Sequence, residues 1–115
     1  MTLREARVAF TACLAELIQM AEEMGYEMAL GEGMDRVTAK DPTTDHRPGS
    51  LHEIGLAQDI DLYRHGLWLS KTEDHLPFGE YWEEMGKLRG YPLAWGGRFS
   101  KPDGNHYSLK WRGRS

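Results

Sequence analysis

The sequence predicts an α+β fold: a small, mainly antiparallel sheet with two principal helices. Two segments carry apolar residues at helical spacing, one at the start of the chain and one in its second half. Short apolar or alternating segments, bounded by Gly, Pro, Asp and Asn, follow each of them and are typical of strands and turns. At 115 residues, we expect a single domain, 1–115, with one modest core.

The first helix is predicted to begin at a capping box formed by Thr2 and Glu5 and to end at Gly25. Its apolar residues recur at helical spacing, at Leu3, Ala6, Phe10, Cys13, Leu14, Leu17, Met20, Ala21 and Met24. We expect this stripe to pack on the core; a membrane or partner-helix role is the alternative. Cys13 is the only cysteine, which excludes an internal disulfide and a zinc site made of several cysteines.

A short strand is predicted next, at Tyr26–Leu30, and a long loop at Gly31–Ser50. Loops of this length are unusual in compact domains and tend to be functional. A second strand, Leu56–Tyr63, then turns at residues 64–66 and returns antiparallel as Leu67–Leu69. This part of the chain is therefore expected to form a β-hairpin.

The second half begins with a polar connection, Lys71–His75, and continues into the second helix, with Pro77 near its start and Gly90 at its end. Two more short strands are predicted, at Leu93–Trp95 and Tyr107–Trp111, around a loop over residues 96–105. The last four residues are expected to be frayed.

The net charge of the chain, −4, argues against a general nucleic-acid binder, because binding phosphates needs a basic face. The N-terminal residues lack the basic-then-apolar order of a signal peptide, and no apolar run reaches transmembrane length. We therefore expect a monomer that folds in a reducing cytoplasm without stable membrane insertion.

A candidate metal site is formed by His52, Asp59 and a distant second histidine, His106. These residues can supply three nitrogen and oxygen ligands of the kind zinc prefers and leave the fourth position to water. Gly55 lets the backbone turn between His52 and the strand that carries Asp59. Asp103 can reach the same site, and since all of these acids cannot bind in a simple tetrahedral site, one is free to act as a base. The alternative is a set of ordinary turn and strand residues with no metal between them.

Two linked motifs carry a family resemblance: Ser50-Leu51-His52-Glu53-Ile54-Gly55-Leu56-Ala57-Gln58-Asp59 and, near the C-terminus, Asp103-Gly104-Asn105-His106-Tyr107. Together they resemble the zinc peptidases of the D-alanyl-D-alanine carboxypeptidase and L-alanyl-D-glutamate endopeptidase family, in particular its short single-domain phage endolysins. The similarity extends from about Leu30 to Leu109 and includes Phe78–Glu83 and Trp95–Phe99.

The resemblance implies the hedgehog and D,D-peptidase type of fold. It also implies Zn²⁺ as cofactor, with His52, Asp59 and His106 as its ligands and Asp103 as the general base. The family uses an arginine ahead of the first motif, thought to steady the carbonyl oxygen of the scissile bond, and Arg36 is the best match for it.

Three further residues are candidates for substrate binding or for support of the site. Arg47 is the alternative to Arg36, and Ser50, two residues before His52, can orient a ligand or the substrate. Trp95, with the two glycines that follow it, is expected to form the floor and rim of the cleft.

The implied function is cleavage of the L-alanyl-D-glutamate bond in the peptidoglycan stem peptide by an endolysin. Such an enzyme is expected in the host bacterial cytoplasm, and it would act on the cell wall after the membrane is permeabilised. One alternative is a D,D-carboxypeptidase or dipeptidase with the same metal site. Another is a metal-bearing cell-wall binding module that does not cleave, although a structural zinc site has no need of a free base such as Asp103.

Overall fold

The computed structural model describes residues 1–31 and 50–115 of the chain. Within them the elements follow the order α1 (Leu3–Glu23), β1 (Glu27–Leu30), β2 (Ala57–Arg64), β3 (Leu67–Leu69), the short 3-10 helix η1 (Thr72–His75), α3 (Leu76–Arg89), β4 (Leu93–Trp95), the 3-10 helix η2 (Gly96–Arg98) and β5 (His106–Leu109). The fold is therefore α+β, as the sequence predicts.

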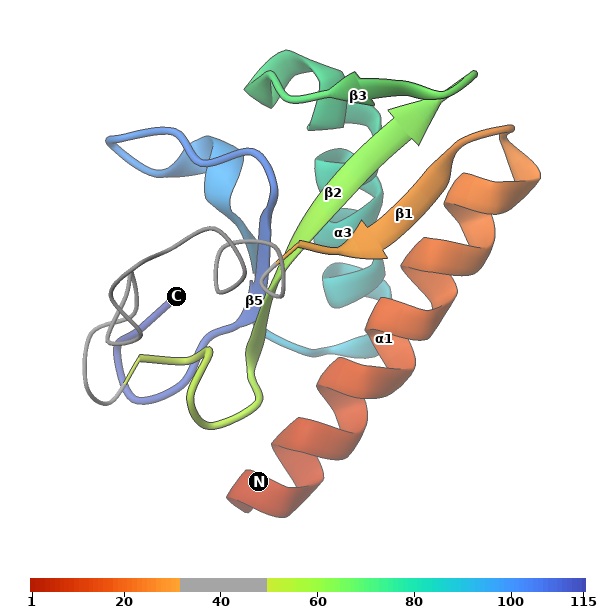
Figure 1. The fold of residues 1–115 in the computed structure, drawn as a ribbon. Helices are drawn as coiled ribbons and strands as arrows, with labels where there is room; N and C mark the ends of the chain where they lie inside the picture. The colour runs from red at the N-terminus through yellow and green to blue at the C-terminus, as the bar shows by residue number, and fades with distance from the viewer. Residues whose placement is uncertain (32–49) are drawn as a thin grey trace.

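The sheet is organised around β2, the longest strand in the described part of the chain. The strand order is β1-β2-β5-β4, β3 also pairs with β2, and every pairing is antiparallel. The first half of β2 pairs with β5 and its second half with β1 and β3, so β2 connects all parts of the sheet. Figure 1 shows α3 behind this sheet and α1 alongside it.

The core lies between the two helices and one face of the sheet. The apolar stripe of α1 packs inward, as expected, with Ala6, Cys13 and Leu17 fully buried. Trp82 of α3 meets the ring of Phe10 edge-on, at a centroid distance of 5.7 Å, and its indole N–H donates to the carbonyl of Ser108 at 3.1 Å. That hydrogen bond ties α3 to β5, the strand that contains His106. Among the described residues, no helix is long and apolar enough to span a membrane.

The start of α1 forms as the capping pattern predicts. The backbone N–H of Thr2 donates to the Glu5 carboxylate at 2.7 Å, and the backbone N–H of Glu5 donates to the Thr2 hydroxyl at 3.1 Å. These two bonds satisfy backbone donors that an uncapped helix would leave without partners. The helix ends before Gly25, whose φ of +87° is a conformation that other residues rarely adopt.

The C-terminal half differs from the prediction in three places. The segment expected as a polar connection contains η1, whose last residue, His75, is almost fully buried. The last strand ends at Leu109, not at Trp111. Residues 112–115, expected to be frayed, instead include a turn closed by backbone hydrogen bonds between Trp111 and Arg114. Residue type alone does not reveal the hydrogen bond of His75 to Tyr107 or the bonds between Trp111 and Arg114.

Candidate active site

The pairing of β2 with β5 brings Asp59 and His106 together. The two residues are directly opposite each other in the antiparallel register, where side chains on one face of a sheet are near neighbours. Oδ1 of Asp59 lies 3.6 Å from Nδ1 of His106. The β2–β5 pairing thus brings together two predicted ligands that are far apart in sequence.

His52 joins them from the turn that precedes β2. The hydroxyl of Ser50 accepts a hydrogen bond from the backbone N–H of His52 at 3.1 Å, and the turn passes through Gly55, whose φ is +78°. This conformation places Nε2 of His52 3.6 Å from Oδ1 of Asp59. Ser50 therefore fixes the backbone beside His52, and Gly55 provides the positive φ that the turn needs.

The three side chains form a group whose ligand atoms, one from each residue, lie within 4.8 Å of one another. In a tetrahedral site with ligands about 2.0–2.1 Å from zinc, neighbouring ligand atoms are about 3.3 Å apart. The two separations that involve Asp59, both 3.6 Å, are close to that value. Two imidazoles and one carboxylate thus fit zinc in donor type, and two of their three separations fit its spacing.

Asp59 supports the same conclusion by its surroundings. Its Oδ1 is buried and, within the described part of the chain, has no hydrogen-bond partner. Burying a carboxylate oxygen without a partner costs free energy. A cation between this oxygen and the imidazole nitrogens of His52 and His106 would offset that cost, so the residues present fit a metal ion.

Asp103 lies on the loop between η2 and β5, at the edge of this group. Its backbone N–H donates to the carbonyl of Gly96 at 2.9 Å, and its own carbonyl accepts from the N–H of His106 at 3.1 Å. Partial burial of its carboxyl group and the negative charge of Asp59 raise the pKa of Asp103, and His106 opposes this shift. A carboxylate with a raised pKa takes up a proton more readily, which suits a general base.

The loop that carries Asp103 is held on both sides of Gly104. The indole N–H of Trp95 donates to the Gly104 carbonyl at 2.7 Å, and the Gly104 N–H donates to the Thr72 hydroxyl at 3.2 Å. A Cβ at Gly104 would lie 2.5 Å from the Cα of Thr72, so only glycine fits this contact. These bonds limit the movement of the residue that follows Asp103.

Of the two roles considered for Trp95, substrate binding and support of the site, its burial favours support. It is 2% exposed, so it lies beneath the Asp103 loop and presents almost no surface to a substrate. Cβ atoms added at Gly79 or Gly97 would come within 2.1 or 2.3 Å of its ring, which shows how closely the backbone covers it. Its role in this structure is support of the loop.

Two further residues near the site, Thr72 and His75, are not predicted from the sequence. Nδ1 of His75 is hydrogen-bonded to the hydroxyl of Tyr107 at 2.8 Å. Burial lowers the pKa of His75 to about 4 and raises the pKa of Tyr107, so both side chains are neutral near pH 7. The pair anchors η1 to β5 beside His106, but no local pattern distinguishes residues 71–75 from an exposed polar connection.

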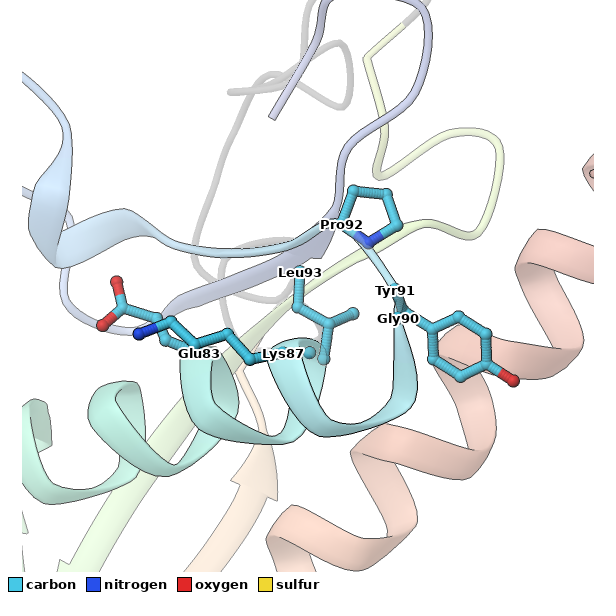
Figure 2. Close-up of a pocket in the computed structure, with 7 residues that line it drawn as sticks. Glu83, Lys87, Gly90, Tyr91, Pro92 and Leu93 are labelled. Atoms are coloured by element: carbon cyan, nitrogen blue, oxygen red, sulfur yellow. The ribbon is translucent and has the colours of Figure 1, made fainter.

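The two predicted arginines, Arg36 and Arg47, lie outside the described residues. A surface depression of about 610 Å³ is found elsewhere, between the end of α3 and the start of β4 (Figure 2), and is lined by Glu83, Gly86, Lys87, Gly90, Tyr91, Pro92 and Leu93. Its lining includes none of the predicted site residues. The predicted metal ligands and Asp103 therefore lie around the β2–β5 pairing and not at this depression.

Two comparisons with known proteins give matches, one to the sequence and one to the fold. A family model described as D-alanyl-D-alanine carboxypeptidase matches residues 43–109, a range that includes His52, Asp59, Asp103 and His106. The crystal structure of the L-Ala D-Glu endopeptidase ChiX from Serratia marcescens is similar in fold, with a TM-score of 0.58 and 19% sequence identity. The similarity covers 95% of this chain and 86% of that one. No curated protein matches the chain.

Proposed function

The chain belongs to the D-alanyl-D-alanine carboxypeptidase family of peptidases, and on this premise we propose that it is a zinc-dependent peptidase acting on the stem peptide of bacterial peptidoglycan. The observation that carries the proposal is the convergence of His52, Asp59 and His106, with Asp103 beside them. We further propose that it cleaves the L-alanyl-D-glutamate bond. The fold it shares with an L-Ala D-Glu endopeptidase supports this choice.

In the proposed mechanism, His52, Asp59 and His106 would hold the metal ion. A zinc ion there would polarise the carbonyl of the scissile bond and lower the pKa of a water molecule. Asp103 accepts the proton from the attacking water and then passes it to the leaving amine. The hydrogen bonds of Trp95 and Thr72 to Gly104 keep Asp103 in position for both transfers.

The oxyanion that develops on the scissile carbonyl also needs a donor. We propose Arg36 for this role, with Arg47 as the alternative, on the sequence resemblance alone. A well-aimed donor of this kind contributes about 3 kcal/mol to transition-state stabilisation. Replacing each arginine with lysine in turn would distinguish them, because lysine keeps the charge but loses the planar fork of donors.

A second candidate function is removal of a terminal D-alanine. The name of the matching family, D-alanyl-D-alanine carboxypeptidase, favours it. The same metal site and base would serve both reactions, so the two differ only in how the substrate is bound. A binding module without activity is less well supported. Asp103 lies beside the metal group and has a raised pKa, and a purely structural metal site would not need such a base.

The experiment that separates these functions is mass spectrometry of peptidoglycan digested by the zinc-loaded protein. The proposal predicts stem peptides with a new D-glutamate amino terminus and no free D-alanine. Free D-alanine as the main early product would move the protein to the carboxypeptidase reaction. Intact peptidoglycan after long incubation would contradict both.

A further inference from the structure

The sheet face that carries the candidate metal site continues along β2 to two aromatic residues, Tyr63 and Trp68. Ile60 and Leu62 of β2 are fully buried on the core face. Because side chains alternate along a strand, Asp59 and Tyr63 both point to the opposite, open face. Trp68 of β3 is directly opposite Tyr63 in the antiparallel pairing and shares that face, with 64% of its surface exposed.

Among residues 1–31 and 50–115, the exposure of this face differs between its two ends. Toward the start of β2, Ala57 and its cross-strand neighbour Ser108 are buried. Toward the other end, Tyr63 is half-buried and Trp68 is exposed. At about 3.3 Å per residue, Tyr63 lies about 13 Å along the strand from Asp59. Within the described residues, β2 thus runs from the metal group to the β2–β3 hairpin (Figure 1), which carries Tyr63 and Trp68.

An acidic side chain lies beside the two aromatic rings. Glu27 of β1 is exposed and directly opposite Tyr63, on the side away from Trp68. A peptide segment rich in carboxylates would be repelled by this charge. A neutral sugar would not be, and its hydroxyl and N-acetyl N–H groups can donate hydrogen bonds to carboxylates.

From this combination we infer that Tyr63 and Trp68 bind a sugar ring of the peptidoglycan glycan strand. The apolar C–H face of an N-acetylated sugar packs on a flat aromatic ring, and indole and phenol provide large, rigid contact areas. The inference rests on the proposed function for the identity of the substrate. In peptidoglycan the L-alanine of the stem peptide is joined to a muramic acid of the glycan, so a sugar lies close to the scissile bond. Tyr63 is likewise close to the metal group, about 13 Å from Asp59 along the strand.

The test measures sugar binding to the zinc-free protein, where no cleavage can occur. The probe is a tetrasaccharide of β-1,4-linked N-acetylglucosamine, followed by NMR of the tryptophan indole N–H signals. The Trp68 signal should move on titration, whereas those of Trp82 and Trp95, which are 0% and 2% exposed, should not. Trp68→Ala should weaken binding at least tenfold, and Trp68→Phe should retain most of it.

Leu67 provides the matched control. It is 68% exposed, next to Trp68 in the same strand, and points to the other face, so Leu67→Ala should bind the tetrasaccharide like the wild type. Equal affinities for Trp68→Ala and Leu67→Ala would overturn the inference. So would a wild-type protein that binds a sugar-free stem peptide at this surface but not the tetrasaccharide.

Cleavage by the zinc-loaded protein gives a second readout. The ratio of the rate on whole sacculi to the rate on a sugar-free stem peptide should fall about tenfold in Trp68→Ala and stay constant in Leu67→Ala. An unchanged ratio in Trp68→Ala would contradict the inference. If the wild type cleaves neither substrate, the proposed function fails, whereas the tetrasaccharide titration still decides whether this surface binds sugar.

Discussion

Two buried histidines lie close to β5, and their surroundings differ. His75 and His106 are 2% and 6% exposed, so burial does not distinguish them. His75 is hydrogen-bonded to Tyr107, whereas within the described residues Nε2 of His106 has no partner and its Nδ1 faces Asp59. The partner atoms, and not burial, therefore distinguish a histidine that stabilises the fold from one that is placed to bind a metal.

Replacing a metal ligand should reduce activity more than replacing His75. His106→Ala removes a ligand nitrogen, so we expect zinc occupancy to fall and peptidase activity to drop to background, and likewise for His52→Ala and Asp59→Ala. His75→Gln should keep its zinc, because an amide can still hydrogen-bond to Tyr107. Metal analysis of the purified variants checks this, and full zinc content in His106→Ala would remove it from the ligand set.

Asp103→Asn should have the next largest effect. The change keeps the size of the side chain but removes its ability to accept a proton, so the rate should fall by about 10²-fold to 10⁴-fold with zinc content near that of the wild type. Steady-state kinetics and metal analysis on the same samples check both halves of this expectation. Joint loss of zinc and activity, with recovery on adding zinc, would instead make Asp103 a ligand.

The stability of the metal-free protein should depend on pH through His75. Its pKa is about 4 in the folded protein against an ordinary value of 6.5, so between these values the unfolded chain binds more protons. The contribution of His75 to the free energy of unfolding is therefore fully present above about pH 6.5. As the pH falls toward 4, this contribution decreases by at most about 3 kcal/mol.

Urea unfolding of the metal-free wild type and of His75→Gln at several pH values between 7.5 and 4 isolates this contribution. The difference in free energy of unfolding between the two proteins should shift by about 3 kcal/mol across the range in favour of the variant. A constant difference would show that His75 takes up no proton on unfolding.

The smallest effect concerns the contact that holds the Asp103 loop. Thr72→Val keeps the shape of the side chain but leaves the Gly104 N–H without its acceptor, at a cost of about 1 kcal/mol. We expect kcat to fall about fivefold with KM and zinc content unchanged, and Thr72→Ser to retain the wild-type rate. Equal kcat for Thr72→Val and the wild type would show that the loop does not need this bond.

The elements that the sequence predicts well are those whose causes are local. The capping pair of Thr2 and Glu5 defines the start of α1, and His65 and Gly66, with φ of 53° and 76°, form the turn of the predicted hairpin. The metal group was predictable because its three residues occur in motifs with family spacing. The same patterns could not reveal how those motifs meet, since the pairing of Asp59 with His106 depends on the register between β2 and β5.

The residues that the sequence did not reveal act through contacts between distant segments. Thr72 reaches Gly104 and His75 reaches Tyr107, each across 32 positions of the chain. Trp95 was predicted as a site residue, but its burial beneath the loop follows from the packing of Gly79 and Gly97 on its ring. Such positions become visible only when the tertiary structure places both partners.

The most direct test of the whole account is X-ray absorption spectroscopy of the zinc-loaded protein. We predict one zinc per chain, coordinated by two imidazole nitrogens and a carboxylate oxygen. One imidazole should be lost in His106→Ala, and both should be retained in His75→Gln. A zinc environment with the same imidazole count in the wild type and in His106→Ala would contradict it.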